Sequence, residues 1–432
     1  MTGLLRDRLG PVATIALAQL FGTSLWFSAN GAADDLLRAW QLSPVDIGLL
    51  TSMVQAGFIL GTLWISLSGV ADRYRPSAVF VCSAIAGAAA NACFALLAQG
   101  LWAACVFRFI VGLSLAGIYP IGMKLMVGWA PQRAGAALSM LVAMLTVGTA
   151  LPHALREAGA GLPWQLIIVS SSLLALLGAA MIHRLGDGPQ RAVPAAKAGP
   201  AAAVAPAAGM RQAASAAAAA PPGAVSVSES PRQRLFAGFR DRRVQAAAVG
   251  YFGHMWELYA FWTLVPLLVA QFGVASSQTL IGVSGFSFCV IAIGAVGAVI
   301  GGRLSRRIGS AKVAIGFLVA SGLCLVLVAM GWRELPIAAL AVLLLLWGAT
   351  VVADSPHFSA LTAQSCPPDR VGSTLAIQNS IGFLITVVSI SMSTALFERI
   401  GADAVWLLLP GPVFGVIGFA LLHRRERRAG VE

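Results

Sequence analysis

Long apolar runs alternate with short polar segments along the whole chain. Twelve of these runs have about 18–27 residues, long enough for a helix to cross a hydrocarbon core about 30 Å thick. The strands of a membrane barrel would alternate apolar and polar residues, whereas these runs are continuous. The pattern therefore predicts twelve membrane-spanning helices, at about Pro11–Ala33, Asp46–Gly69, Ser77–Leu97, Leu101–Lys124, Gly135–Pro152, Leu162–His183, Val244–Ala270, Thr279–Gly302, Lys312–Gly331, Pro336–Phe358, Gly372–Phe397 and Ala402–His423.

A segment of different composition divides the twelve runs into two sets of six. Residues 192–222 consist largely of alanine and proline, a composition that cannot bury a core and is typical of a disordered linker. We therefore predict a six-helix bundle over 1–183, a cytoplasmic linker over 184–243, and a second six-helix bundle with a basic tail over 244–432.

The overall composition indicates that lipid is the main solvent of this chain. Of its 432 residues, 58% are hydrophobic and 11% are charged, whereas about a quarter of the residues of a soluble domain are charged. The net charge of +12 could indicate nucleic acid binding, but the basic residues are spread over the ends of the apolar runs. An integral membrane protein with no nucleic acid partner explains both observations.

The basic residues also predict the orientation in the membrane. If both termini and the linker share one side, 24 of the 29 Lys and Arg residues fall on that side, four on the other, and Arg108 within a span. Lys and Arg accumulate on the cytoplasmic side of membrane proteins. We therefore predict a multi-pass protein of the inner (plasma) membrane with both termini in the cytoplasm.

The sequence contains no pattern typical of an enzyme or a metal site. Its six cysteines are scattered without a Cys-x-x-Cys pair, so we predict neither a disulfide framework nor a metal centre. The glycine-rich stretch at 294–302 lies within an apolar run and lacks the lysine of a phosphate-binding loop. We therefore predict no enzymatic activity, no cofactor and no ATP hydrolysis.

Matching landmarks in the two sets of runs indicate an internal repeat. Both sets contain six spans in the same orientation, so the repeats are parallel and related by an axis along the membrane normal. The landmarks lie about half the chain apart: Asp72 pairs with Arg306, Tyr119-Pro120 with Ser355-Pro356, and Phe21-Gly22 with Phe252-Gly253.

The loop after the second span of each half carries a motif. Residues 302–309 are Gly-Arg-Leu-Ser-Arg-Arg-Ile-Gly, and residues 70–74 are Val-Ala-Asp-Arg-Tyr. With twelve spans and a long central linker, these motifs make the chain resemble the major facilitator superfamily over essentially its whole length. The family's pattern is Gly-x-Leu-Ala-Asp-Arg-Phe-Gly-Arg-Arg; here Arg306 replaces the acid in the second half, and Ser68 replaces the first glycine in the first half.

The resemblance implies roles for the residues of these loops. Asp72 and Arg73 would help to lock the cytoplasmic ends of the helices when the transporter faces outward. Asp72 would do so at the start of the eleventh span near Gly372, where a helix N-terminus favours an anion. The other candidate gate residues are Gly302, Arg306, Arg307 and Asp354, the last as a partner for a loop arginine.

A single arginine, Arg108, lies inside the fourth span. A cation in hydrocarbon costs roughly 2.5–3.5 kcal/mol on insertion scales, so we expect it to face a wet cavity or a partner. Gly112 and Ala116 follow at four-residue steps and would let another helix approach closely. In the family this pattern is often linked to proton coupling.

The family's antiporter pattern in the fifth span is only partly matched at 148–152, which favours uptake.

Glu257 in the seventh span is the second candidate for the chemistry. Counting residues places it about 20 Å from the cytoplasmic end and Arg108 about 10 Å from the outer end, which are similar depths in a core about 30 Å thick. The resemblance implies that spans 1, 4, 7 and 10 line the cavity. We therefore hypothesise that Arg108 and Glu257 share one central site in which Glu257 is the coupling carboxylate. The alternative is a structural ion pair between helices.

Other polar and aromatic residues of the spans are further candidates. His254 lies one turn before Glu257 on the same helix face and could relay protons, although a histidine that only packs explains it equally well. Aromatic residues in spans are more often packing or interface residues. Asp34 and Asp35 are expected to be solvated at the end of the first span. The remaining candidates for substrate binding are Asn30, Tyr119, Trp256 and Tyr259.

Together these features predict an all-α secondary transporter with two parallel six-helix halves that works by alternating access as a monomer. It would couple uptake of a small solute to protons, and Arg108 suggests an anionic solute. Two alternatives remain open: proton-coupled efflux of amphipathic or drug-like compounds, and, as another class, a membrane sensor or scaffold that keeps the fold without transport.

Overall fold

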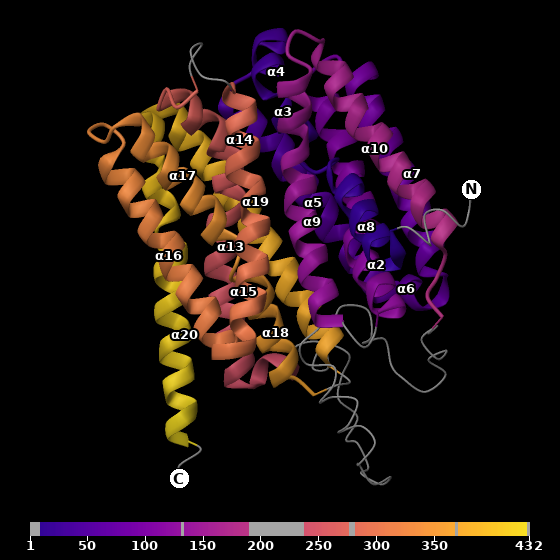
Figure 1. The fold of residues 1–432 in the computed structure, drawn as a ribbon, viewed down its shortest axis with the longest axis vertical. Coiled ribbons are helices and arrows are strands. Elements are labelled where there is room, and N and C mark those ends of the chain that lie inside the picture. The colour runs from indigo at the N-terminus through magenta and orange to yellow at the C-terminus, as the bar shows by residue number, and fades with distance from the viewer. Residues whose placement is uncertain (1–8, 131–133, 190–236, 276–280, 368–369, 430–432) are drawn as a thin grey trace.

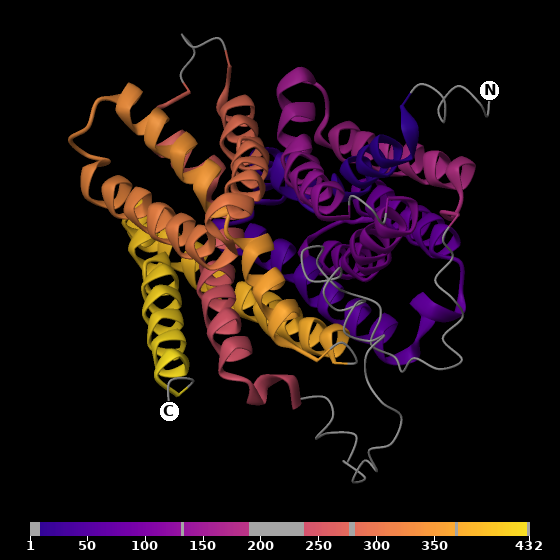
Figure 2. The same cartoon turned by 60° about the horizontal axis from the view of Figure 1, so that its bottom comes forward.

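The computed structural model describes residues 9–130, 134–189, 237–275, 281–367 and 370–429, without the side chains of 71–72, 134–138, 237 and 424–429 (Figure 1). All regular secondary structure in these residues is helical. The helices before the linker and those after it form two groups that lie side by side (Figures 1 and 2). The predicted all-α membrane fold with two helical halves is therefore confirmed.

The first group, the N-half, contains α2 (Gly10–Thr23), α3 (Ser28–Gly31), α4 (Ala33–Trp40), α5 (Pro44–Ser68), α6 (Val70–Arg73), α7 (Pro76–Leu97), α8 (Leu101–Trp129), α9 (Ala134–Ala158) and α10 (Trp164–Leu185). The second group, the C-half, contains η2 (Ala237–Arg240), α13 (Arg242–Gln271), α14 (Val283–Ala292), α15 (Gly294–Ile308), α16 (Ser310–Gly331), α17 (Ile337–Val351), α18 (Ser355–Ser365), α19 (Val371–Ile400), η3 (Gly401–Leu408) and α20 (Pro410–Ala429). Eight described helical segments are long and apolar enough to cross a membrane.

Several predicted spans are interrupted rather than continuous. The first leaves its helix at Ser24–Phe27, between α2 and α3, and the tenth at 352–354, between α17 and α18. Pro356 explains the second break, because proline lacks the N–H that would donate to the carbonyl of Val352 and is well accommodated in the first turn of a new helix. Non-helical backbone at membrane depth needs internal partners for its polar groups. These breaks therefore place backbone N–H and C=O groups without helical partners in the middle of the molecule.

The bundle has two ends, which we call the linker face and the opposite face. The linker face contains the end of α10, the start of α13 and the α15–α16 junction at Gly309 (Figure 1). The opposite face contains α4 and the start of α14 (Figure 1). The two halves meet through α5 against α19, and through α9 against α14 and α15.

Small residues allow α5 and α8 to pack closely. A Cβ at Gly112 of α8 would collide with the carbonyl oxygen of Val54, and one at Gly57 of α5 would collide with the carbonyl oxygen of Phe109. The predicted close approach of another helix to the fourth span is therefore confirmed. This contact fixes α8, which carries Arg108, against its neighbour.

Asp187, just after α10, holds the linker face of the N-half. Its Oδ1 accepts a hydrogen bond from the Ser77 N–H near the start of α7 at 2.8 Å, and its Oδ2 lies 2.8 Å from Arg75 Nε. Burial opposes ionisation of this carboxyl, but the hydrogen bonds from Arg75 and Ser77 outweigh it and hold the pKa of Asp187 below its ordinary value. The contact thus connects the start of α7 to the end of α10.

Candidate functional site

A cavity of about 400 Å³ lies between the two halves. It begins in the middle of the molecule at Tyr259 and Trp262 of α13, and it extends to the exposed Arg306 of α15 at the linker face. Its walls come from α5, α8 and α9 of the N-half and from α13, α15, α18 and α19 of the C-half. Movement of one half against the other would therefore change its shape and access.

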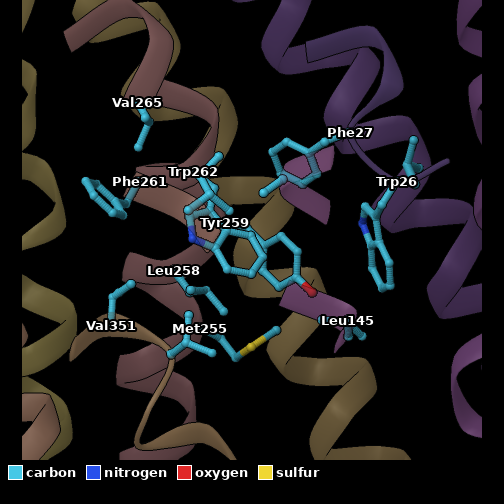
Figure 3. Close-up of a cluster of buried hydrophobic side chains, with 14 of the residues drawn as sticks. Trp26, Phe27, Leu145, Met255, Leu258, Tyr259, Phe261, Trp262, Val265 and Val351 are labelled. Carbon is cyan, nitrogen blue, oxygen red and sulfur yellow. The ribbon is translucent and has the colours of Figure 1, made fainter. Parts of the chain in front are cut away.

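Six aromatic side chains close the cavity toward the opposite face, and we call them the aromatic layer. The ring centroids of Trp26 and Tyr259 are 5.8 Å apart, and those of Phe58 and Phe383 are 4.6 Å apart. Each of these pairs joins the two halves, and Figure 3 shows Trp26 and Phe27 pointing toward Tyr259 and Trp262. The layer consists of Trp26, Phe27, Phe58, Tyr259, Trp262 and Phe383.

Arg108 does not line this cavity. Its side chain is fully buried in the N-half. Nη1 donates to the Leu25 carbonyl oxygen at 3.0 Å and to Ser28 Oγ at 2.8 Å, and Nη2 donates to the Trp26 carbonyl oxygen. These acceptors belong to the break of the first span and to the start of α3. Arg108 therefore satisfies backbone groups that the helix break leaves free.

Glu257 is fully buried within the C-half. Its Oε2 accepts from the Ser321 hydroxyl at 2.9 Å, and its Oε1 accepts from the Trp347 indole N–H at 2.7 Å. The structure does not bring Arg108 and Glu257 together, since each has its described partners in its own half and no ion pair joins them. These two side chains therefore face the interiors of separate halves.

His254 and Asp354 form a second buried contact in the C-half. Nδ1 of His254 lies 2.8 Å from Oδ1 of Asp354, and both side chains are 1% exposed. Asp354 lies in the turn between α17 and α18, away from solvent, and in this conformation its described partner is His254 rather than a loop arginine. Asp354 interacts electrostatically with Glu257 and with His357, and His357 lines the cavity. We call His254, Glu257, Asp354 and His357 the acid–histidine group.

The remaining predicted binding residues are separated by the fold. Tyr119 and Tyr259 line the cavity. The Asn30 amide donates to Thr51 Oγ1 at 3.0 Å on the opposite-face side of the aromatic layer. The Trp256 indole N–H donates to the Leu407 carbonyl oxygen at 2.8 Å, within the C-half. The cavity thus includes two of these four residues.

The predicted gate residues lie at the linker face. Gly302 and Arg306 line the cavity there, and the side chains of Arg73 and Arg307 are exposed. The side chain of Asp72 lies outside the described residues. In this conformation the linker-face ends of the halves are separated by the cavity.

Glu157, which the sequence analysis missed, joins the two halves at the opposite face. Its Oε1 accepts from the Gly282 N–H at 2.7 Å and its Oε2 from the Gly285 N–H at 2.9 Å. A helix N-terminus such as that of α14 favours an anion. A Cβ at Gly285 would lie 2.9 Å from Glu157 Cδ, so glycine leaves room for this contact. In the sequence, the glycines at 282 and 285 near the start of the eighth span are the available sign of this contact.

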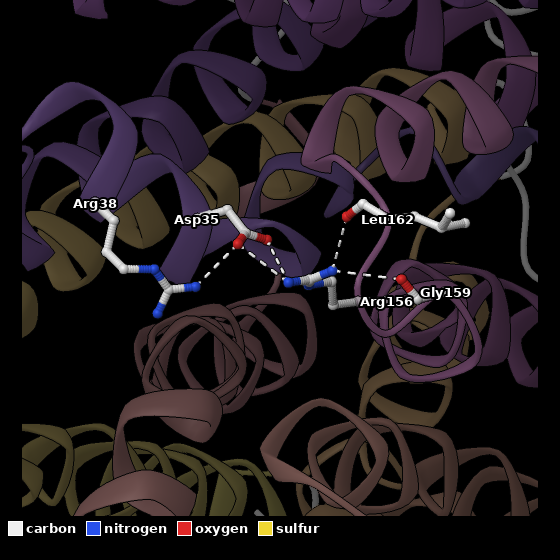
Figure 4. A network of polar contacts seen from close by, with 5 residues as sticks. All are labelled: Asp35, Arg38, Arg156, Gly159 and Leu162. Carbon is white, nitrogen blue, oxygen red and sulfur yellow. Dashed lines mark hydrogen bonds and ion pairs between the residues drawn. The ribbon is translucent and has the colours of Figure 1, made fainter.

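The residue before it, Arg156, binds within its own half (Figure 4). Its Nη2 lies 2.9 Å from Asp35 Oδ2, and its Nη1 donates to the Leu162 carbonyl oxygen at 3.2 Å. Asp35 also pairs with Arg38 at 2.9 Å. Asp34 is exposed as expected, whereas the expectation of a freely solvated Asp35 is wrong, because two arginines hold it.

Among the described residues, no group of three or more His, Cys, Asp or Glu side chains is arranged to hold a metal ion. The acid–histidine group contains four titratable side chains, of which His254 and Asp354 are in direct contact. Carboxyl and imidazole groups of this kind can take up and release protons.

Known proteins share this architecture. The fold is similar to the crystal structure of a bacterial homolog of the human lysosomal transporter Spinster in an inward-facing and unoccupied conformation, with a TM-score of 0.63, 14% identity and 96% of each chain covered. The niacin transporter NiaP of Acinetobacter baylyi is 24% identical over 299 residues, which are 66% of this chain and 64% of that protein. A putative tartrate transporter of Agrobacterium vitis is 28% identical over 239 residues, 52% of this chain and 49% of that protein.

The chain thus spans about half to two thirds of the length of these relatives. A sequence model of the Major Facilitator Superfamily matches residues 15–244 and 247–432, nearly the whole chain. This match, together with the two helical halves and the cavity between them, leads to one conclusion: the chain belongs to the Major Facilitator Superfamily.

Proposed function

We propose that the protein is a secondary active transporter that moves a small organic solute by alternating access and couples its uptake to protons. The observation that carries this proposal is the cavity between the halves, which reaches the linker face and ends at the aromatic layer. A site lined from both halves and open to one side is what alternating access requires. Membership of a family of transporters supports transport rather than an enzymatic reaction.

The linker face is the cytoplasmic face in this proposal. Arginines are exposed there at Arg73 of α6 and at Arg303 and Arg307 near the end of α15, and the positive-inside rule places such residues in the cytoplasm. Both termini then lie in the cytoplasm, the membrane is the inner membrane, and the described conformation faces inward. The exposed arginines would take part in a lock that forms when this face closes.

The acid–histidine group is the proposed proton site. Glu257 and Asp354 are buried carboxyls, and their described partners are hydroxyl, indole and imidazole groups rather than Lys or Arg. A buried carboxylate without a cation is costly, so proton uptake relieves the cost. His357 connects this group to the cavity. A proton could therefore enter from the cavity and reach Glu257 through His357, Asp354 and His254.

Transport by Glu257→Gln in liposomes tests this function. With the relatives' solutes niacin and tartrate as the first candidates, we expect the wild type to accumulate solute when the pH is lower outside. Glu257→Gln should lose this accumulation but keep solute exchange at equal pH. The amide binds no proton, its oxygen can still accept from the Trp347 indole, and its NH2 group can donate to the Ser321 hydroxyl. Accumulation by the variant at the wild-type level would contradict the coupling role.

One control variant and one second variant of the same group complete this test. Glu398→Gln changes an exposed glutamate at the end of α19 and should transport like the wild type. Asp354→Asn should reduce accumulation in the same way as Glu257→Gln, because it interrupts the same group. If the wild type moves solute at a rate that does not depend on the pH gradient, proton coupling is ruled out, while the assignment as a transporter still holds.

The apolar walls of the cavity favour one alternative, proton-coupled efflux of amphipathic compounds. Met123, Met140 and Met255 line the cavity together with aromatic residues, and such side chains adapt to varied apolar ligands. The same liposomes distinguish the two directions. Solute expelled when protons enter, rather than accumulated with them, would support efflux.

A further inference from the structure

Three of the four tyrosines of this chain line the cavity. Tyr119 comes from α8, and Tyr251 and Tyr259 come from α13. Tyr251 and Tyr259 are 4% and 5% exposed, and the three side chains are close enough to interact electrostatically. None of their hydroxyls has a hydrogen-bond partner within the described residues. Their oxygens are not among the fully buried atoms of the described residues, so they are accessible from the cavity. Tyrosine hydroxyls in apolar surroundings usually find a partner, and here a ligand in the cavity can supply one.

The closed end of the cavity offers flat apolar surfaces to the same ligand. Trp262, Phe58 and Phe383 of the aromatic layer line it there. Aromatic rings attract one another in offset-stacked or edge-to-face arrangements. Tyr259 belongs to the aromatic layer and is also one of the three cavity tyrosines. One ligand could therefore place its aromatic ring against the layer and its polar substituent on the tyrosine hydroxyls.

The cavity has little positive charge for a polyvalent anion. Among its described lining residues the one Lys or Arg is Arg306, which lies at the linker face. Arg108, which suggested an anionic solute, is fully buried in the N-half, and its Nη1 and Nη2 donate to acceptors there. Carboxylates are bound tightly by arginine or lysine, and an unpaired charge in an apolar site is costly. A dianion such as tartrate therefore fits this cavity poorly.

We propose that the cavity binds planar aromatic or heteroaromatic molecules with at most one negative charge, with the ring against the aromatic layer and the polar substituent on the three tyrosine hydroxyls. This inference rests on the proposed function for its physiological meaning, but binding itself needs no gradient. The volume of about 400 Å³ lies in the lower part of the range of small-molecule sites, about 300–1,000 Å³. It corresponds to a solute of one or two rings.

Calorimetric binding to the purified protein tests the proposal. The ring probes are benzoate, nicotinate, nicotinamide and indole-3-carboxylate, and the comparison probes are tartrate, succinate and inorganic phosphate. We expect ring probes to bind and the comparison probes to bind at least tenfold more weakly. Tyr119→Phe, Tyr251→Phe and Tyr259→Phe should each weaken ring-probe binding about three- to tenfold, because each removes one hydroxyl and keeps the ring.

The fourth tyrosine, Tyr74, provides the matched control. It is 63% exposed, outside the cavity, so Tyr74→Phe should bind every probe like the wild type. Tartrate binding as tight as that of the ring probes, or no binding of any ring probe, overturns the proposal. So does ring-probe binding that none of the three cavity variants weakens. A protein that binds ring probes but moves none of them across liposomes would refute the proposed transport and leave this binding site intact.

Discussion

Arg108 is connected to the site although it does not line the cavity. Its guanidinium reaches the Leu25 and Trp26 carbonyl oxygens, where the first span has left its helix. The next residue, Phe27, and Trp26 itself belong to the aromatic layer. Arg108 therefore positions the residues that close the cavity, by supplying the donors that the broken backbone needs.

Replacing Arg108 should destabilise the protein strongly. Each buried carbonyl left without a donor costs about 1–3 kcal/mol, so Arg108→Ala should lose roughly 3 kcal/mol or more. Arg108→Lys should also be less stable than the wild type, because a point charge cannot reproduce the forked geometry of the guanidinium. Thermal unfolding of the purified protein measures both effects.

Arg73→Ala is the control for loss of a positive charge, since Arg73 is exposed at the linker face. Its unfolding temperature should match that of the wild type. An Arg108→Ala protein that melts like the wild type but no longer binds anions would show instead that Arg108 acts on the solute.

At the scale of elements, the end of α9 connects both halves through two consecutive residues. Arg156 is held by Asp35 of α4, within the N-half. Glu157 accepts hydrogen bonds from Gly282 and Gly285, at the start of α14 in the C-half. The first contact keeps α9 in its own half, and the second holds the opposite face closed against the other half.

Glu157→Gln should loosen the opposite face. The amide keeps the size of the side chain but has one acceptor oxygen instead of two and no charge for the N-terminus of α14. Charge interactions with a helix end are worth about 0.3–1 kcal/mol, so we expect the open population to rise about twofold to fivefold. A cysteine at the buried Thr394 of α19, in a protein whose native cysteines are replaced, reports this opening by its labelling rate with a membrane-impermeant maleimide.

Glu398→Gln, at the exposed end of α19, should leave this labelling rate unchanged. If Glu157→Gln labels no faster than the wild type, the contact with α14 does not hold the opposite face. Slower labelling would mean that the carboxylate favours the open form.

At the scale of the whole molecule, the two halves separate at one end and meet at the other. The cavity divides them toward the linker face, while α5 packs against α19 near the opposite face. There the hydroxyl oxygens of Ser52 and Ser391 lie 3.5 Å apart, one from each half. Alternating access requires that this contact opens when the solute enters from the opposite side.

A disulfide across this contact should stop transport. Ser52→Cys combined with Ser391→Cys should form a cross-link on oxidation, transport in liposomes should fall to background, and reduction should restore it. The double variant Thr362→Cys and Gln378→Cys, whose native side chains lie 2.7 Å apart within the C-half, should transport in both redox states. Full activity with a complete Ser52→Cys/Ser391→Cys cross-link would rule out separation of the halves at this face.

Much of the architecture was predictable because it depends on local properties of the chain. An apolar run of sufficient length must be a helix in lipid, whatever its neighbours are, so the spans and the division into halves followed from the pattern. The motif at Gly302–Gly309 and the residues around Arg108 indicated the family for the same reason. The orientation in the membrane and the monomeric state stay predictions.

The arrangement of the polar residues was not predictable in the same way. Counting along a span gives the depth of Arg108 or Glu257 but not the direction in which its side chain points about the helix axis. The sequence pattern predicts Asp354 as a gate residue near the end of the tenth span, but it does not show the break between α17 and α18 that buries this side chain beside His254. Glu157 could not be assigned a partner, because Gly282 lies 125 residues away in the chain.

By itself, the sequence determined that this is a helical membrane protein of two related halves. The length of an apolar run and the repetition of a motif are properties of the chain that do not depend on which residues meet in space. The tertiary structure alone decided which polar groups meet: Arg108 with the break of the first span, Glu257 with Ser321 and Trp347, and three tyrosines around one cavity. The physical reason is that such contacts depend on how each helix is rotated and where it is interrupted. Those features are set by packing among all the helices together.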